Sequence, residues 1–162
     1  SGGRGYVEKD WGRSLPQAWV WFQSNHFGRP GTCITASVAV IPWMGSAFNG
    51  FIVGLLHDGR LHVFATYNRA RLEHLEITDQ VVVWVLRAGG YRLEMAAERA
   101  EGGILRAPTV FEMDRRIAET LNARVEVRLL ALAGGRSRLV FHGTGTTAGL
   151  EAVGDMQRLM QG

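Results

Sequence analysis

Alternating apolar and polar residues run through most of the chain. In YRLEMAAE, at residues 91–98, every second side chain is apolar and most of the others are charged. Residues 123–129 show the same period, and residues 71–77 and 80–88 add two more strand-like stretches. A period of two places successive side chains on opposite faces of a β-strand. Together with the glycine-rich turns between these stretches, it predicts roughly nine or ten strands in an antiparallel meander.

Two stretches have helical spacing instead. Residues 111–121 have a weak helical period, and residues 150–160 carry a clearer apolar stripe. A chain with so many strands must hide its sheet edges, and closure into a barrel does that. We therefore predict an all-β fold, an antiparallel lipocalin-like (calycin-type) β-barrel with a short C-terminal helix. A two-sheet sandwich is the alternative. A barrel of about eight strands can hold one small ligand.

The chain length fits one domain. Its 162 residues suffice for a single core, which we assign to residues 5–162. Residues 1–4 begin with Ser-Gly-Gly and are interpreted as a cloning remnant. The single cysteine, Cys33, excludes an internal disulfide. No apolar run reaches the roughly 18 residues of a membrane-spanning helix, so we expect a cytoplasmic protein, with peripheral membrane contact allowed for.

The charge distribution and the absence of several motifs exclude some classes of function. The net charge is only +3, and Lys9 is the single lysine among 18 basic residues. The arginines are scattered without the aromatic interleaving of single-strand binders, so no nucleic acid partner is expected. The sequence has no phosphate loop, nucleophile elbow, paired cysteine or His-x-x-x-His spacing, so neither a cofactor nor a metal is expected. His57 lies in a turn-like stretch and is expected to be solvated.

Residues 19–27, WVWFQSNHF, form the expected strand with the most candidate functional side chains. One face carries Trp19, Trp21, Gln23 and Asn25, and the other carries Val20, Phe22, Ser24 and His26. One interpretation is a core strand whose amides bond to the backbone. The other is a pocket wall, on which the indoles hold an apolar ligand and the two amides orient its polar end. His26 ends the opposite face and is a further candidate ligand contact.

The stretch Glu8-Lys9-Asp10 places charge just before this strand. Alternation points Glu8 and Asp10 one way and Lys9 the other. On a solvent-exposed strand end such ion pairs contribute little. If the two carboxylates face a cavity, one of them can serve as a proton donor. If Lys9 faces inward, it would hold a phenolate or a carboxylate. Trp11, just after this stretch, would anchor the entry to the strand.

Residues 6–27 resemble the characteristic segment of the tocopherol cyclase family. The matching positions are Glu8, Lys9, Trp11, Gly12, Pro16, Trp19, Trp21, Gln23, Asn25 and Phe27. LRAPT at 105–109 and AGLEAVG at 148–154 are similar to two later family segments. Asp10 stands where the family has Asn, and Ser24 where it has Cys. Proteins of the family have two lipocalin-like halves, and this chain resembles the C-terminal half.

The resemblance implies a reaction and roles for residues. Tocopherol cyclases close a chromanol ring on a prenylated hydroquinone without a redox cofactor: an acid protonates an alkene, and the phenol oxygen captures the cation. By resemblance, Asp10 or Glu8 would be the acid, Lys9 its tuning partner, and Gln23 and Asn25 contacts of the quinol oxygens. Such a protein would bind an apolar isoprenoid or quinol-type ligand in the barrel cavity.

Two alternatives to a cofactor-independent cyclase remain. The chain would be a non-catalytic lipocalin-like carrier of a hydrophobic small molecule, or a half-domain that packs on a second lipocalin-like domain or on a second copy of itself. Arg106, in the LRAP segment, has two interpretations as well. It would hold the anionic end of a ligand, or it would tie an end of the barrel by bonding to backbone carbonyls, with Glu151 as a candidate partner.

Overall fold

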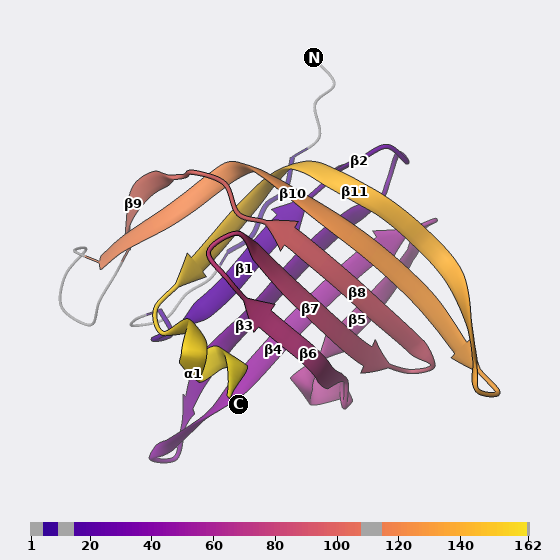
Figure 1. The fold of residues 1–162 in the computed structure, drawn as a ribbon, viewed down its shortest axis with the longest axis horizontal. Coiled ribbons are helices and arrows are strands. Elements are labelled where there is room, and N and C mark those ends of the chain that lie inside the picture. The colour runs from indigo at the N-terminus through magenta and orange to yellow at the C-terminus, as the bar shows by residue number, and fades with distance from the viewer. Residues whose placement is uncertain (1–4, 10–14, 108–114, 162) are drawn as a thin grey trace.

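The strands of the protein form one antiparallel sheet (Figure 1). This computed structural model describes residues 5–9, 15–107 and 115–161, without the side chain of Arg115. The strands are β1 (Trp19–Ser24), β2 (His26–Phe27), β3 (Cys33–Trp43), β4 (Ser46–His57), β5 (Arg60–Ala65), β6 (Arg71–Ile77), β7 (Val81–Ala88), β8 (Tyr91–Glu98), β9 (Gly103–Ala107), β10 (Arg115–Ala133) and β11 (Arg136–Val153). A 3-10 turn, η1 (Thr66–Asn68), and one helix, α1 (Met156–Met160), complete the described elements. The all-β antiparallel class is confirmed.

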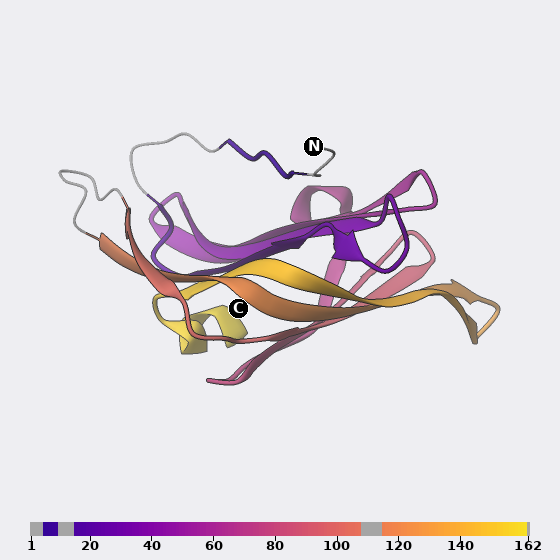
Figure 2. The same ribbon diagram turned by 90° about the horizontal axis from the view of Figure 1, so that it is seen from above.

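The sheet curls so that its two arms face each other across one core (Figures 1 and 2). Its strand order is β5-β4-β3-β1-β11-β10-β8-β7-β6, with β2 paired to β11 and β9 to β10. The centre of the core is Trp84, whose ring meets Phe22 and Phe51 edge-on at centroid distances of 6.1 and 6.4 Å. The largest other fully buried side chains are Phe64, Ile34, Leu55, Leu86, Leu93 and Leu129. We call this side of the sheet the inner face and the opposite side the outer face.

The curled sheet does not close into a ring. Its edges are β5 and β6, and no ladder joins these two among the described strands. The amide nitrogen of Asn68 donates to the carbonyl of Val63 at 3.0 Å, and its oxygen accepts from the N–H of Ala65 at 3.0 Å. These side-chain bonds use backbone groups of β5, while β6 carries an irregularity between Leu72 and His74. Both features suit sheet edges that avoid further pairing.

Of the two stretches predicted to be helical, only the C-terminal one contains a helix among the described residues, which confirms the expected short C-terminal helix. Residues 115–121 belong to β10, whose first residues pair with β9, and residues 111–114 lie outside the described part. Residues 150–153 end β11, and only α1 is helical; it starts after Asp155, whose carboxylate accepts two N–H groups of the first turn. Ladder hydrogen bonds to neighbouring strands outweigh weak helical propensity here. In the described residues, no helix is long and apolar enough to cross a membrane.

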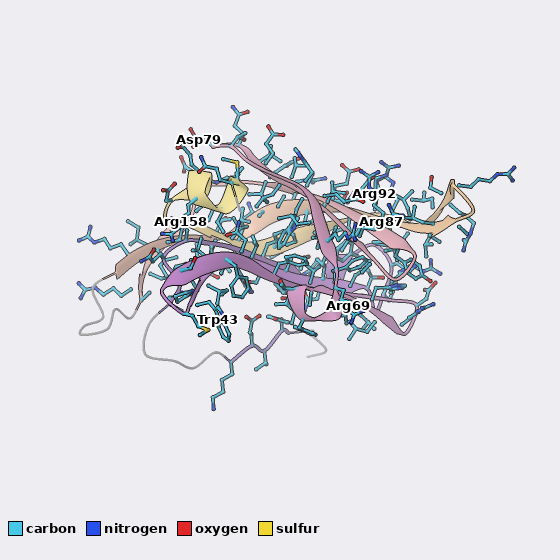
Figure 3. The ribbon with its side chains drawn as sticks, turned by 90° about the horizontal axis from the view of Figure 1, so that it is seen from below. Trp43, Arg69, Asp79, Arg87, Arg92 and Arg158 are labelled. Carbon is cyan, nitrogen blue, oxygen red and sulfur yellow. The ribbon has the colours of Figure 1, made fainter. Side chains whose placement is uncertain are left out.

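The outer face differs between the two arms. On β6, β8, β10 and β11 it carries linked ion pairs, such as Arg92–Glu73 and Arg92–Glu94 at 3.0 Å and Arg128–Glu94 at 2.9 Å. On β3 and β4 it carries Ala39, Ile41, Phe48 and Ile52 instead, and Trp43 follows at the hairpin tip. Figure 3 shows Trp43 on the side of residues 5–9, with Arg87, Arg92 and Arg158 on the other side. The outer face is therefore charged on one arm and apolar on the other.

Candidate functional site

The outer face of β1 carries the two indoles singled out in the sequence. Val20 and Phe22 are fully buried in the main core, so Trp19, Trp21 and Gln23 point to the opposite side of the sheet. Trp19 packs there in a second apolar cluster with Ala39, Ile117 and Val153. Large side chains from both arms fill the inner side of the described sheet, so Trp19, Trp21 and Gln23 do not face a space between the arms.

The N-terminal segment, residues 5–9, lies across this outer face (Figure 2). The Trp21 indole N–H donates to a carboxylate oxygen of Glu8 at 3.2 Å, and the Tyr6 hydroxyl donates to the same oxygen. The Tyr6 hydroxyl also lies 3.0 Å from the Thr35 hydroxyl of β3. Glu8, the first residue of the EKD stretch, is therefore placed directly against Trp21, as a pocket wall carrying an acid would require.

Two further carboxylates stand beside the indoles. Trp19 donates from its ring N–H to Glu151 of β11 at 2.7 Å. Glu119 of β10 is the ladder partner of Glu151, so both side chains project from the same face. We call Trp19, Trp21, Gln23, Glu8, Glu119 and Glu151 the indole site. Three carboxylates around two indole rings give it strong hydrogen-bond acceptors.

Glycine at position 149 leaves room for the Trp21 ring. A β-carbon there would lie 2.9 Å from Cζ3 of Trp21 and 3.8 Å from Oε1 of Glu119. The first distance is below normal contact, so an alanine would displace the ring. Gly149 is also the ladder partner of Gln23. Trp21, Gln23 and Glu119 thus surround one backbone position that carries no side chain.

An apolar groove opens next to the indole site on the outer face of β3 and β4. Its volume is about 520 Å³, which falls in the usual range for small-molecule pockets. The lining residues are Ser37, Ala39, Ile41, Phe48, Gly50, Phe51, Ile52, Thr66 and Tyr67. Ser37 and Ala39 are the ladder partners of Trp21 and Trp19, so the groove borders the indole site on the outer surface.

Gln23 carries an unsatisfied polar group within this surface. Its side chain is 9% exposed, and its amide nitrogen is buried without a hydrogen-bond partner among the described residues. Burying an amide donor unpaired costs on the order of 1–3 kcal/mol. A ligand oxygen at this position would remove that cost.

The other predicted site residues do not join the indole site. Asn25 is half-buried between β1 and β2, and His26 is exposed in β2, opposite Thr146. Arg106 is exposed on β9 and alternates with Ala107, which packs in the Trp19 cluster; Arg106 therefore points away from the indoles. Lys9 is exposed beside Glu8. Asp10 and Trp11 lie outside the described residues.

No cofactor or metal position is evident in the part of the chain that the structure describes. Among its His, Cys, Asp and Glu side chains, no three are grouped so that they could hold a metal ion. Among the described residues, the arrangement instead combines hydrogen-bond acceptors, the unpaired Gln23 donor, the partly exposed Trp21 ring and an apolar groove. Such a surface can bind an elongated apolar molecule with an oxygen-bearing end.

Comparison with known proteins decides the family. Residues 2–154 match the sequence profile of the family described as tocopherol cyclase-like. The chain belongs to this family. The match covers nearly the whole chain and confirms the resemblance noted for residues 6–27. No curated protein and no solved structure matches the chain. Family membership supports a cyclase-like fold, and the residues of this chain must carry any further argument about the site.

Tyr6 and Glu119 belong to the site although sequence reasoning missed both. Tyr6 precedes the EKD stretch and was not considered. Glu119 lies in a stretch interpreted as helical, which hid its place on a strand face. Residues 115–121 show no clear alternation of apolar and polar side chains, so the sequence carries no signal for the strand face on which Glu119 lies.

Two buried histidines lie at another end of the sheet. The His57 side chain is only 3% exposed, so the expectation of a solvated turn residue is wrong; the ring faces inward, 4.4 Å from the Phe141 ring. His62 packs edge-on against Tyr91 at 4.9 Å. Burial lowers the pKa of His62 below its usual value, and the charges of Arg60 and His57 lower that pKa further.

The lowered His62 pKa predicts that acid weakens the fold. The unfolded chain takes up a proton near the ordinary histidine pKa, whereas folded His62 does so only at lower pH. The unfolding free energy should thus hold above the ordinary pKa and fall as pH drops through the window between the two values. Denaturant titrations from about pH 8 to about pH 5 measure this dependence. His62→Phe should reduce the slope and His26→Gln, an exposed control, should not; equal slopes in all three proteins would contradict the assignment.

Proposed function

We propose that this protein binds an elongated apolar molecule of the isoprenoid quinol class on the outer face of β1, β3 and β4. The groove would hold the apolar chain, and the indole site would hold the oxygen-bearing end. The observation that carries the proposal is the apolar groove of about 520 Å³, two of whose lining residues, Ser37 and Ala39, pair with Trp21 and Trp19. Family membership supports a ligand of this kind.

The reaction that we propose for such a ligand is acid-promoted, cofactor-free ring closure. A carboxylic acid gives its proton to one alkene carbon, which breaks the π bond and leaves a tertiary cation on the other carbon. The phenol oxygen then bonds to that cation, and its proton returns to a carboxylate. Glu8 is our candidate proton donor within the described residues, and indole faces such as Trp21 favour a nearby cation. Gln23 would hydrogen-bond a quinol oxygen.

A groove-filling substitution tests the binding proposal. Ser37→Phe places a ring at the floor of the groove and should weaken binding of a prenylated hydroquinone about tenfold or more, since several methylene contacts are lost. Tryptophan fluorescence during titration gives Kd, and chromatography of the extracted probe detects a chromanol product. Ala96→Phe is the matched control, because Ala96 lies on the outer face of β8, in the charged arm. Equal weakening by both variants would sink the groove assignment.

The apolar half of the outer face favours a second function, packing against another sheet. Ile52, Leu61 and Tyr67 are 51%, 59% and 75% exposed, and apolar patches of this kind commonly mark interfaces. In that case the same face would be covered by a second lipocalin-like domain or a second copy of the chain. The native protein would then bind no prenylated hydroquinone, so the titration above separates the two functions.

A further inference from the structure

Among the described residues, Glu119 differs in its contacts from the other two carboxylates of the indole site. Glu8 accepts from Trp21 and Tyr6, and Glu151 accepts from Trp19. No hydrogen bond or ion pair to Glu119 is found among the described residues, although its side chain is half-buried. Its ladder partner is another carboxylate, and like charges directly opposite each other destabilise a sheet. An acid at this position therefore does not stabilise the ligand-free fold.

A second, independent feature next to Glu119 points to a ligand. Gln23 is more than nine-tenths buried, and its amide nitrogen has no partner among the described residues. Gln23 pairs in register with Gly149, and the missing β-carbon of Gly149 lies 3.8 Å from Oε1 of Glu119. An unused acceptor and an unused donor thus flank the backbone position over which Trp21 lies.

We propose that Glu119 is the residue that selects a hydroxyl group on the bound ligand. Its carboxylate accepts the hydrogen bond of the hydroxyl, and the Gln23 amide nitrogen donates to a ligand oxygen, while the aromatic ring carrying that hydroxyl lies against Trp21. This assignment rests on the proposed function and adds a recognition residue from β10 to it. A hydroxyl satisfies both groups at once because it donates and accepts.

The distance between the groove and Glu119 also limits the shape of the ligand. The groove lies over β3 and β4, whereas Glu119 is on β10. Four strand spacings separate β4 from β10 in the sheet, which corresponds to about 19 Å at the usual spacing. A molecule that contacts both ends must be long and apolar with one polar end, as a prenylated phenol is.

A binding cycle with two probes and two proteins tests the role of Glu119. The probes are a prenylated methoxyphenol and the corresponding dimethyl ether, which lacks the hydroxyl, and Kd is measured by tryptophan fluorescence on the full chain. The native protein should bind the phenol about tenfold or more tighter than the ether, as a charge-assisted hydrogen bond provides. Glu119→Gln should reduce this ratio to about threefold or less, because the amide is a weaker acceptor. It should not lower stability, because it removes a like-charge pair.

The control is Glu126→Gln, which removes a carboxylate from the exposed face of the same strand. Glu126 pairs with His142 at 2.8 Å and lies in the charged part of the outer face. This variant should keep the native ratio between phenol and ether. If native protein and Glu119→Gln give the same ratio, or if native protein binds both probes equally, Glu119 is not the hydroxyl acceptor and only this inference fails. If native protein binds neither probe, the proposed function fails as well.

Discussion

Trp84→Ala is expected to cost about 3–5 kcal/mol of unfolding free energy, the range for removing a large aromatic side chain from a packed core. Trp84, on β7, is 0% exposed and lies against Phe22 of β1 and Phe51 of β4, which belong to the facing arm of the sheet. Its removal leaves a cavity between the arms that neighbouring side chains fill only in part. Chemical denaturation followed by circular dichroism measures the loss.

The matched control is Trp43→Ala, which removes the same side chain from the tip of the β3–β4 hairpin. Trp43 is 63% exposed, so its loss should change stability by no more than about 0.5 kcal/mol. If the space between the arms were a ligand cavity, Trp84→Ala would enlarge that cavity at little cost in stability. A Trp84→Ala protein as stable as Trp43→Ala would therefore contradict the packed interior.

Gly154→Ala is expected to cost about 3 kcal/mol or more, through backbone strain and steric overlap together. Gly154 has φ +89°, a conformation that L-residues rarely adopt. A β-carbon there would also lie 2.1 Å from the carbonyl oxygen of Gln17 and 2.8 Å from Cα of Ala18. These are backbone atoms just before β1, so the overlap can be relieved only by moving the start of β1 away from the end of β11. Thermal and denaturant unfolding would both report the loss.

Gly135→Ala separates strain from overlap. Gly135, in the β10–β11 turn, has φ +75° but no atom within 4 Å of an added β-carbon. It should cost about 1 kcal/mol, the strain of a left-handed alanine alone. Equal losses at positions 135 and 154 would show that close packing of Gly154 on the segment before β1 does not contribute.

Strand patterning in the sequence was most informative where one face is charged. Residues 91–98 and 123–129 alternate because their outer face carries the ion pairs of the charged arm, and both are strands in the structure. The pattern failed at residues 115–121, where short-range spacing resembled a helix but β9 supplied a pairing partner that the local sequence does not reveal. The predicted closed barrel is an open sheet among the described strands, with edges at β5 and β6. The Asn68 side-chain bonds and the irregularity in β6, which suit free edges, depend on tertiary contacts that the local sequence does not reveal.

The candidate site was predictable in part. Glu8, Trp19, Trp21 and Gln23 do gather on one surface, as the pocket-wall interpretation required. The sequence could not say which face of β1 meets the core, because both faces begin with apolar residues; packing of Phe22 against Trp84 decides it. Glu119 could not be found either, since it is brought to Trp21 by the ladder between β10 and β11.

Neighbouring methyl groups of β4 distinguish a ligand on the outer face of the sheet, as we propose, from one inside the curled sheet. Ile52 is 51% exposed on the outer face, whereas Val53, the next residue, is 0% exposed on the inner face. Nuclear Overhauser effects would be measured between a bound prenylated hydroquinone and the methyl groups of both residues. We expect contacts from the prenyl chain to Ile52 and none to Val53. Contacts to Val53 without contacts to Ile52 would place the ligand inside the curled sheet and contradict the account.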